Sequence, residues 1–173
     1  MKIILLLFLI VASKASGQVV ATKTTMNDIG KAGSIKVQKV TTITGNDTMI
    51  AYGITKNGGM FDVTTGYIVS LTRNEVPEVI EALKSFQTEI KKSKPENMTS
   101  VSYKTKDSTI ISCSYFKGTG WTVMIQNTNK QVEEEFEKMQ YKTGYQFNQF
   151  VQIDPFKLDA VIKLLSKTVT DAN

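Results

Sequence analysis

The chain of 173 residues contains no histidine and one cysteine, Cys113. The lack of histidine excludes Ser-His-Asp and Cys-His catalysis, histidine-ligated zinc and every imidazole base. One cysteine cannot form an intrachain disulfide or a thiolate zinc cluster. A nucleophilic thiol would need a lysine or arginine beside it, because only these could stabilise its thiolate in this chain. We therefore interpret Cys113 as a small buried hydrophobic residue.

Carboxylates are the remaining groups that could carry acid–base chemistry. The chain has 16 Asp and Glu residues, so two of them could lie at the separation that glycoside hydrolysis requires. No pattern singles out a pair: Asp62 falls on a predicted strand, Asp107 at a predicted turn, and Asp154 at a helix start. A carboxylate-dependent hydrolase stays an alternative without assigned residues. The prediction is a protein that is not an enzyme and has no catalytic residues.

Two short motifs could bind an ion or a phosphate. Glutamates cluster in the predicted short helix 131–140, but consecutive residues of a helix point in different directions, and no calcium-loop motif accompanies them. Gly118-Thr119-Gly120 precedes a strand, whereas a phosphate-binding loop opens a helix. We interpret 131–140 as an inserted acidic helix exposed to solvent, and we predict neither a metal site nor a cofactor.

The first 17 residues have the pattern of a secretory signal peptide. Lys2 supplies a positive start, Ile3–Ala12 is an unbroken apolar run, and small residues precede Gln18. The run is too short to span a bilayer comfortably. We expect cleavage after Gly17, with a retained anchor or a buried N-terminal helix as the alternative. The sequence therefore predicts a secreted or periplasmic protein.

Cleavage would remove Lys2 and Lys14 and lower the formal net charge from +5 to +3. Such a modest charge favours solubility and gives little attraction for nucleic acid or anionic membrane. No later apolar run approaches the length of a membrane span. Asn46 and Asn97 begin N-glycosylation triplets, which arise often by chance, and their use stays open.

The chain contains an internal repeat at an offset of 82 residues, from Val69 to Val151. In each copy a short apolar stretch leads into four apolar residues spaced i, i+3, i+4 and i+7, which form one stripe of an amphipathic helix. The matched positions are Val69 with Val151, Leu71 with Ile153, Val76 with Leu158, Val79 with Val161, Ile80 with Ile162, and Leu83 with Leu165.

Each predicted helix also has a start signal. Thr72 and Glu75 have the spacing of a capping box, in which each side chain accepts a hydrogen bond from the other's backbone. Asp154 is a strong N-cap, and Pro155 after it loses no hydrogen bond at the first helical position. Two short strands are therefore expected to run directly into capped helices.

The residues before each helix favour β-structure, because they are rich in Thr, Val, Ile and Tyr and are divided by turn residues. The expected strands are 34–43, 48–55 and 60–71 in the first half, and 100–106, 109–117, 121–127 and 144–153 in the second. The predicted fold is α+β, with two tandem antiparallel-sheet-plus-helix (ββββα) repeats packed as one domain. Its parts are a flexible N-terminal arm (18–33), the first repeat (34–90), a linker (91–98) and the second repeat (99–173).

Alternation along the strands of the second repeat assigns each side chain to a face. One face, with Cys113 at its centre, would pack on the helices: Ile111, Cys113, Tyr115, Trp121, Val123 and Ile125. The other face carries Ile110, Phe116, Met124 and Phe150, with the polar companions Ser112, Ser114, Thr122, Gln146, Asn148 and Gln152. Two phenylalanines are unusual on a solvated face, so we expect this candidate partner surface to be covered. The inserted helix, a second protomer or a ligand could cover it.

A four-stranded antiparallel sheet followed by a helix, occurring twice, resembles the Whirly and PUR-type single-stranded nucleic-acid binders. The strand-to-helix junctions Val69–Leu83 and Val151–Leu165 carry this resemblance, which spans residues 34–168. It implies a sheet-plus-helix topology, and no binding residue carries over because the basic-aromatic motifs of those binders are absent. The export signal argues against a DNA or RNA role. The sequence is also similar to small exported bacterial proteins to which no activity is assigned.

The sequence thus favours an exported, non-catalytic binding or interaction module. Its partner would be an unknown protein, a small ligand or a second copy of the chain. A binder of single-stranded nucleic acid or another polyanion, using the sheet face, is the first alternative, and a hydrolase is the second.

Overall fold

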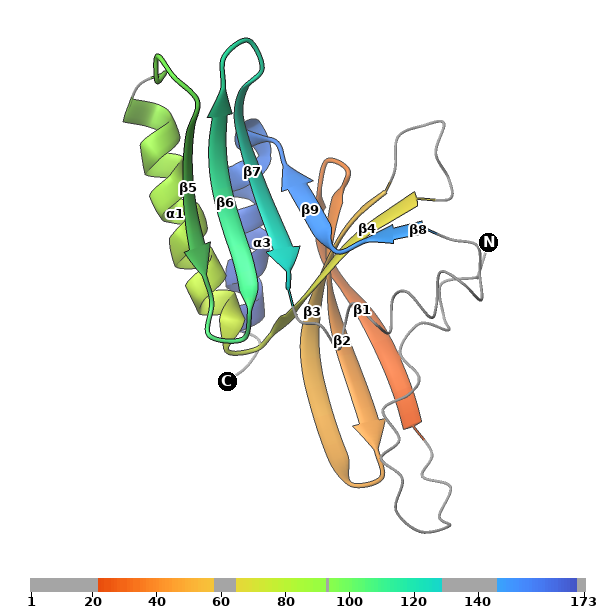
Figure 1. Cartoon of the computed structure of the whole chain (residues 1–173). Helices are drawn as coiled ribbons and strands as arrows, with labels where there is room; N and C mark the ends of the chain where they lie inside the picture. The colour runs from red at the N-terminus through yellow and green to blue at the C-terminus, as the bar shows by residue number, and fades with distance from the viewer. Residues whose placement is uncertain (1–21, 58–64, 93, 129–145, 171–173) are drawn as a thin grey trace.

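The computed structural model describes residues 22–57, 65–92, 94–128 and 146–170 (Figure 1). The predicted signal peptide (1–17) and the predicted inserted helix (131–140) lie outside these ranges. Among the helices described, none is long and apolar enough to cross a membrane.

The first half of the chain forms an antiparallel sheet followed by a helix. Its elements are β1 (Thr22–Ala32), β2 (Ile35–Thr44), β3 (Asp47–Asn57), β4 (Thr65–Thr72) and α1 (Glu75–Lys92). The strands pair in chain order, each antiparallel to the next. Gly33 and Gly45 occupy the two tight hairpin turns with positive φ, a conformation that glycine adopts without steric cost.

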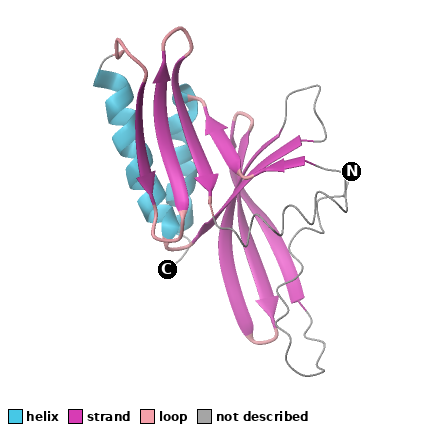
Figure 2. Ribbon diagram, in the orientation of Figure 1, coloured by secondary structure: helices cyan, strands magenta, loops and turns pink. Residues whose placement is uncertain are grey.

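The second half repeats this plan. Its elements are β5 (Thr99–Lys104), β6 (Thr109–Phe116), β7 (Gly120–Asn127), β8 (Gln146–Asn148), β9 (Phe150–Ile153), a 3₁₀ turn (Pro155–Lys157) and α3 (Leu158–Thr170). The antiparallel sheet has the order β5-β6-β7-β9. The predicted α+β fold of two four-stranded sheets, each followed by a helix, is therefore confirmed (Figure 2).

The prediction of a flexible arm over 18–33 was wrong for the part that the structure describes. Thr22–Ala32 is strand β1, which pairs with β2 from Thr22–Thr44 to Ala32–Ile35. The first repeat therefore begins before residue 34, and this strand is the fourth one that its predicted set lacked. Because β1 lies at the sheet edge, most of its side chains are exposed or half-buried, and no apolar alternation marks it in the sequence.

The single strand predicted over 144–153 is divided in the structure. Gln149 separates β8 from β9, and its carbonyl accepts a hydrogen bond from the backbone N–H of Asn127. β9 completes the second sheet, whereas β8 pairs parallel to β4 and becomes a fifth strand of the first sheet. One continuous stretch of β-type sequence thus joins both sheets.

Both predicted caps are formed. The Thr72 backbone N–H donates to the Glu75 carboxylate over 2.9 Å, and the Glu75 N–H donates to Thr72 Oγ1 over 3.3 Å. At the second helix, the Phe156 N–H donates to the Asp154 carboxylate over 2.9 Å, with Pro155 in the first turn.

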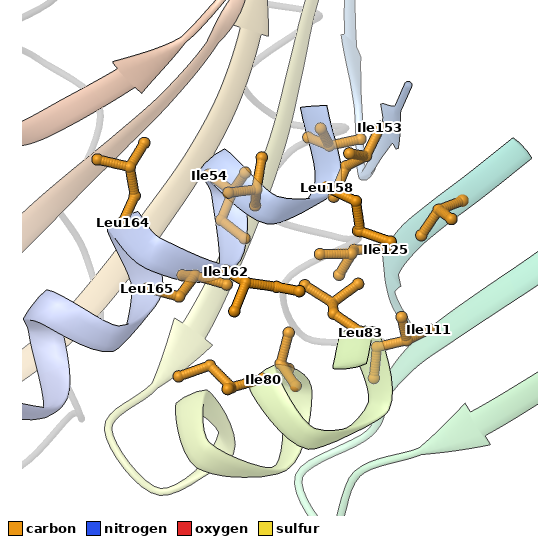
Figure 3. Packing of buried hydrophobic residues seen from close by; sticks show 14 of the residues in the cluster. Ile54, Ile80, Leu83, Ile111, Ile125, Ile153, Leu158, Ile162, Leu164 and Leu165 are labelled. Atoms are coloured by element: carbon orange, nitrogen blue, oxygen red, sulfur yellow. The ribbon is translucent and has the colours of Figure 1, made fainter. Parts of the chain in front are cut away.

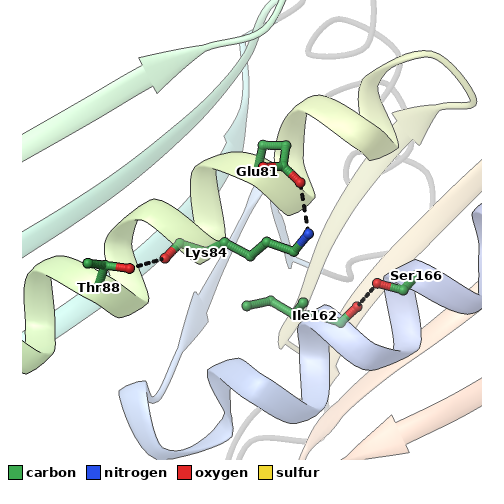
Figure 4. Close-up of polar contacts among 5 residues, drawn as sticks. All are labelled: Glu81, Lys84, Thr88, Ile162 and Ser166. Atoms are coloured by element: carbon green, nitrogen blue, oxygen red, sulfur yellow. Dashed lines mark hydrogen bonds and ion pairs between the residues drawn. The ribbon is translucent and has the colours of Figure 1, made fainter.

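The hydrophobic core is formed by side chains from both helices and from the inner faces of both sheets (Figure 3). The two helices pack side by side behind the second sheet, and α3 also contacts β1 and β2 of the first. The repeat pairs meet here, since Leu71, Ile153, Leu83 and Leu165 are all fully buried. Polar contacts border this helix pair: Lys84 forms an ion pair with Glu81 on α1, and Ser166 donates to the Ile162 carbonyl on α3 (Figure 4).

Candidate functional site

The second sheet has two chemically different faces. Ile111, Cys113, Val123, Ile125, Val151 and Ile153 point to the helices and are fully buried, and Tyr115 and Trp121 join them as an edge-to-face ring pair. The interpretation of Cys113 as a buried hydrophobic residue is confirmed. Burial, and to a lesser extent the charge of Glu89, raises the pKa of its thiol to about 11, so the thiol stays protonated near neutral pH.

The alternate residues form the opposite face, which we call the outer face. Both helices lie against the inner side of this sheet, so neither covers the outer face (Figure 2). Its members are exposed or half-buried: Ser100, Ser102 and Lys104 on β5; Ile110, Ser112, Ser114 and Phe116 on β6; Thr122, Met124 and Gln126 on β7; and Phe150 and Gln152 on β9.

The register brings together three of the four predicted partner residues. Gln126 pairs with Ile110 on one side and with Phe150 on the other, and Met124 lies in the next row, between Ser112 and Gln152. Ile110 and Phe150 therefore flank Gln126 from the two neighbouring strands, and each lies diagonal to Met124, at a spacing at which large side chains reach one another. We call these three residues the apolar trio.

Phe116 does not join the trio. It lies opposite Gly120 at the far end of β6, beyond the row of Ser114 and Thr122, and it is 42% exposed. Two predicted polar companions are also absent from the outer face, because Gln146 and Asn148 belong to β8 in the first sheet. The break at Gln149, which the sequence pattern does not show, is the reason for this difference.

The polar border of the trio carries a single charged group among the described residues, Lys104, which pairs with Ile110 across β5 and β6. Ser100 and Ser114 hydrogen-bond to each other over 2.8 Å on the same face. The outer face thus carries three apolar residues around Gln126, with hydroxyl- and amide-bearing residues bordering them and no carboxylate in its described part.

A separate cleft of about 510 Å³ lies where the start of α1, the end of α3 and the β5–β6 turn meet, and its charged lining residues are Arg73, Glu78, Lys106 and Asp107. Its two carboxylates already have partners. Asp107 accepts a hydrogen bond from Thr72 Oγ1 over 2.8 Å, and Glu78 accepts one from the Tyr103 hydroxyl over 3.0 Å. The second bond raises the pKa of Tyr103.

Glu75, beside this cleft, is a buried carboxylate that links the start of α1 to the second sheet through hydrogen bonds. It is 2% exposed and accepts hydrogen bonds from the Thr72 N–H over 2.9 Å and from Thr105 Oγ1 over 2.6 Å. Thr105 Oγ1 in turn accepts from the Thr109 N–H over 2.9 Å. The capping-box pattern identifies Glu75, but nothing in the sequence points to Thr105, because this contact depends on how the two units pack.

No group of three His, Cys, Asp or Glu side chains that could hold a metal ion occurs within residues 22–57, 65–92, 94–128 and 146–170. The glutamates of 131–140 lie outside these ranges. Comparison of the chain with protein-family models, with curated proteins and with solved structures finds no match.

Proposed function

We propose that the chain is an exported, non-catalytic binding module and that its outer face holds a protein partner. The observation that carries this proposal is the apolar trio, Ile110, Met124 and Phe150, on a sheet face opposite both helices. Protein interfaces commonly combine a small apolar centre with a polar border that excludes water. The outer face has this composition.

A protein fits this surface better than a small molecule does. Small-molecule sites are concave and enclose most of the ligand, whereas one face of a sheet offers a broad platform. The cleft described above lies elsewhere, at the start of α1, and its carboxylates are engaged in hydrogen bonds. Export rests on the signal pattern of residues 1–17 and places the partner outside the cytoplasm.

The test compares partner capture by three forms of the protein from the exported fraction of the native cells. Ile110→Ser combined with Phe150→Ser should abolish capture of any protein that the wild type enriches, while circular dichroism stays unchanged. Phe156→Ser is the matched control, because Phe156 is 93% exposed on the 3₁₀ turn. Unchanged capture by the double variant would reject the outer face as the binding surface. Unfolding of the double variant would also reject it, because the face would then be core.

The second candidate function of the outer face is binding of single-stranded nucleic acid or another polyanion. The two phenylalanines offer surfaces for base stacking, and the described face carries Lys104 and no carboxylate. A labelled oligothymidine should then bind at low salt and dissociate steeply as salt rises, because phosphate contacts release counterions. Absence of binding at low salt would remove this alternative.

A further inference from the structure

Strand β5 is an open sheet edge. In the described chain it pairs with β6 on one side only, and five of its six residues are exposed. An open edge presents unpaired backbone N–H and C=O groups, which are a template for another strand.

Natural sheets protect such edges with bulges, prolines, charges or short strands, and the other three edges show these devices. β1 has a register irregularity between Asp28 and Gly30, and the Asp28 carboxylate forms an ion pair with Lys36. β8 has three residues and β9 has four. β5 instead runs for six residues in continuous register, contains no proline and has one charge, Lys104.

The side chains of β5 that point toward the helix layer are also unusually open. Val101 is 44% exposed and Tyr103 is 42% exposed, although both share a face with the buried Cys113 and Ile111 across the strand pair. α1 packs against β6 and leaves Val101 open, whereas the Tyr103 hydroxyl reaches α1 and donates to Glu78 over 3.0 Å. Met98, just before the strand, is 70% exposed. The open edge therefore combines unpaired backbone with apolar side chains.

We infer that β5 pairs antiparallel with β5 of a second copy, about a two-fold axis at Val101, so that the two four-stranded sheets join. Side chains alternate, so two-fold pairing must align residues of the same face. With Val101 opposite itself, Thr99 meets Tyr103 of the second copy on the helix side, and Ser100 meets Ser102 on the outer side. Every apolar side chain of the edge then gains a neighbour.

The charges agree with this register. Just beyond the strand bounds Thr99–Lys104, at both ends of the pairing, Glu96 of one copy comes near Lys106 of the other. Lys104 falls opposite Met98, on which its aliphatic stem can pack. The two Lys104 residues are six positions apart, roughly 20 Å, which exceeds the screening length at physiological salt. No like charges face each other.

The dimer would also unite the two outer faces into one surface of eight strands. It does not depend on the proposed partner, because the pairing uses the edge of β5 and the partner would use β6, β7 and β9. Phe150→Ser combined with Ile110→Ser should therefore leave dimerisation intact, which separates failure of one proposal from failure of the other.

Sedimentation over a range of protein concentrations tests the dimer. The wild type should shift from monomer toward dimer as concentration rises, and Val101→Lys should suppress this shift by placing two ammonium groups on the axis. Val169→Lys is the matched control, since Val169 has nearly the same exposure (42%) on α3. A wild type that stays monomeric at every concentration, or equal effects of the two variants, would overturn the inference.

Charge reversal tests the register. Glu96→Lys alone, or Lys106→Glu alone, creates two like-charged pairs and should weaken dimerisation roughly tenfold, as the loss of two exposed ion pairs implies. Combining both substitutions restores opposite charges and should return the affinity to near the wild-type value. Additive weakening in the double variant would overturn the proposed pairing.

Cysteine cross-linking gives a direct readout. In a Cys113→Ala background, which removes the cysteine opposite residue 101 on β6, Val101→Cys should form a covalent dimer on mild oxidation, because residues paired directly across antiparallel strands are close enough for a disulfide. Lys104→Cys in the same background should stay monomeric. Cross-linking through Ser102→Cys in place of Val101→Cys would contradict the Val101 axis.

Discussion

At the scale of single residues, the structure uses its buried polar groups to join distant parts of the chain. Glu75 closes the cap of α1 and also accepts the Thr105 hydroxyl from the β5–β6 turn. A buried carboxylate is tolerated only when its oxygens are hydrogen-bonded, so each donor matters. The Thr72–Glu75 capping box could be predicted from its spacing. The contact with Thr105 could not, because it forms only when α1 packs against the second sheet.

Replacing Thr105 with valine should lower the free energy of unfolding by about 1–3 kcal/mol, the usual penalty for a buried group left without a partner. Denaturant unfolding measures the change. Thr88→Val is the control, because the Thr88 hydroxyl bonds to the Lys84 carbonyl on the exposed side of α1. Equal losses of unfolding free energy in the two variants would show that the Thr105 contact stabilises the fold no more than an exposed hydrogen bond does.

Cys113 gives a second prediction at this scale. Its thiol is fully buried and its pKa is raised to about 11. Because the thiolate is the nucleophile, a thiol-alkylating reagent should label the folded protein far more slowly than the denatured protein at pH 8. The thiolate fraction, and with it the labelling rate of the folded protein, should rise about tenfold per pH unit below this pKa and level off above it. Rapid labelling of the native protein at pH 8 would show that Cys113 is accessible.

At the scale of elements, the helices were predictable and one strand was not. The four-residue apolar stripes and the caps mark α1 and α3, since an amphipathic helix must bury one face. β1 carries no such mark, because an edge strand with exposed side chains is held by backbone pairing to β2. The division between β8 and β9 was equally hidden, because a strand that changes sheets keeps β-type residues throughout. The sequence therefore predicted the trio together with Phe116, which lies apart from it, and with Gln146 and Asn148, which belong to the other sheet.

Truncation of the matched leucines tests the repeat. Leu83→Ala and Leu165→Ala should each lower the free energy of unfolding by about 2–5 kcal/mol, the range for fully buried leucine. Val169→Ala, at an exposed position of α3, should change it by less than about 0.5 kcal/mol. Urea titration gives these values, and a small loss at either leucine would contradict the shared core.

At the scale of the whole molecule, the two repeats are interlocked. β8 leaves the second half to pair with β4, and α3 packs against α1, β1 and β2. We therefore expect one cooperative unfolding transition. Fluorescence of the single tryptophan, Trp121 in the second sheet, should follow the same denaturation curve as circular dichroism, which reports both halves. Two separated transitions would show that the halves fold independently.

The hydrogen bond from the Tyr52 hydroxyl to the Thr168 carbonyl joins residues 116 positions apart in the chain. Together with the pairing of β4 and β8, it means that the first sheet obtains its last strand and part of its helical cover only from the C-terminal segment. Until the C-terminal segment docks, the early strands keep unpaired backbone groups at the sheet edge. Closing such long loops slows folding. A chain that stops before β8 would lack both this strand and α3, so the C-terminal segment determines when the N-terminal half reaches its native structure.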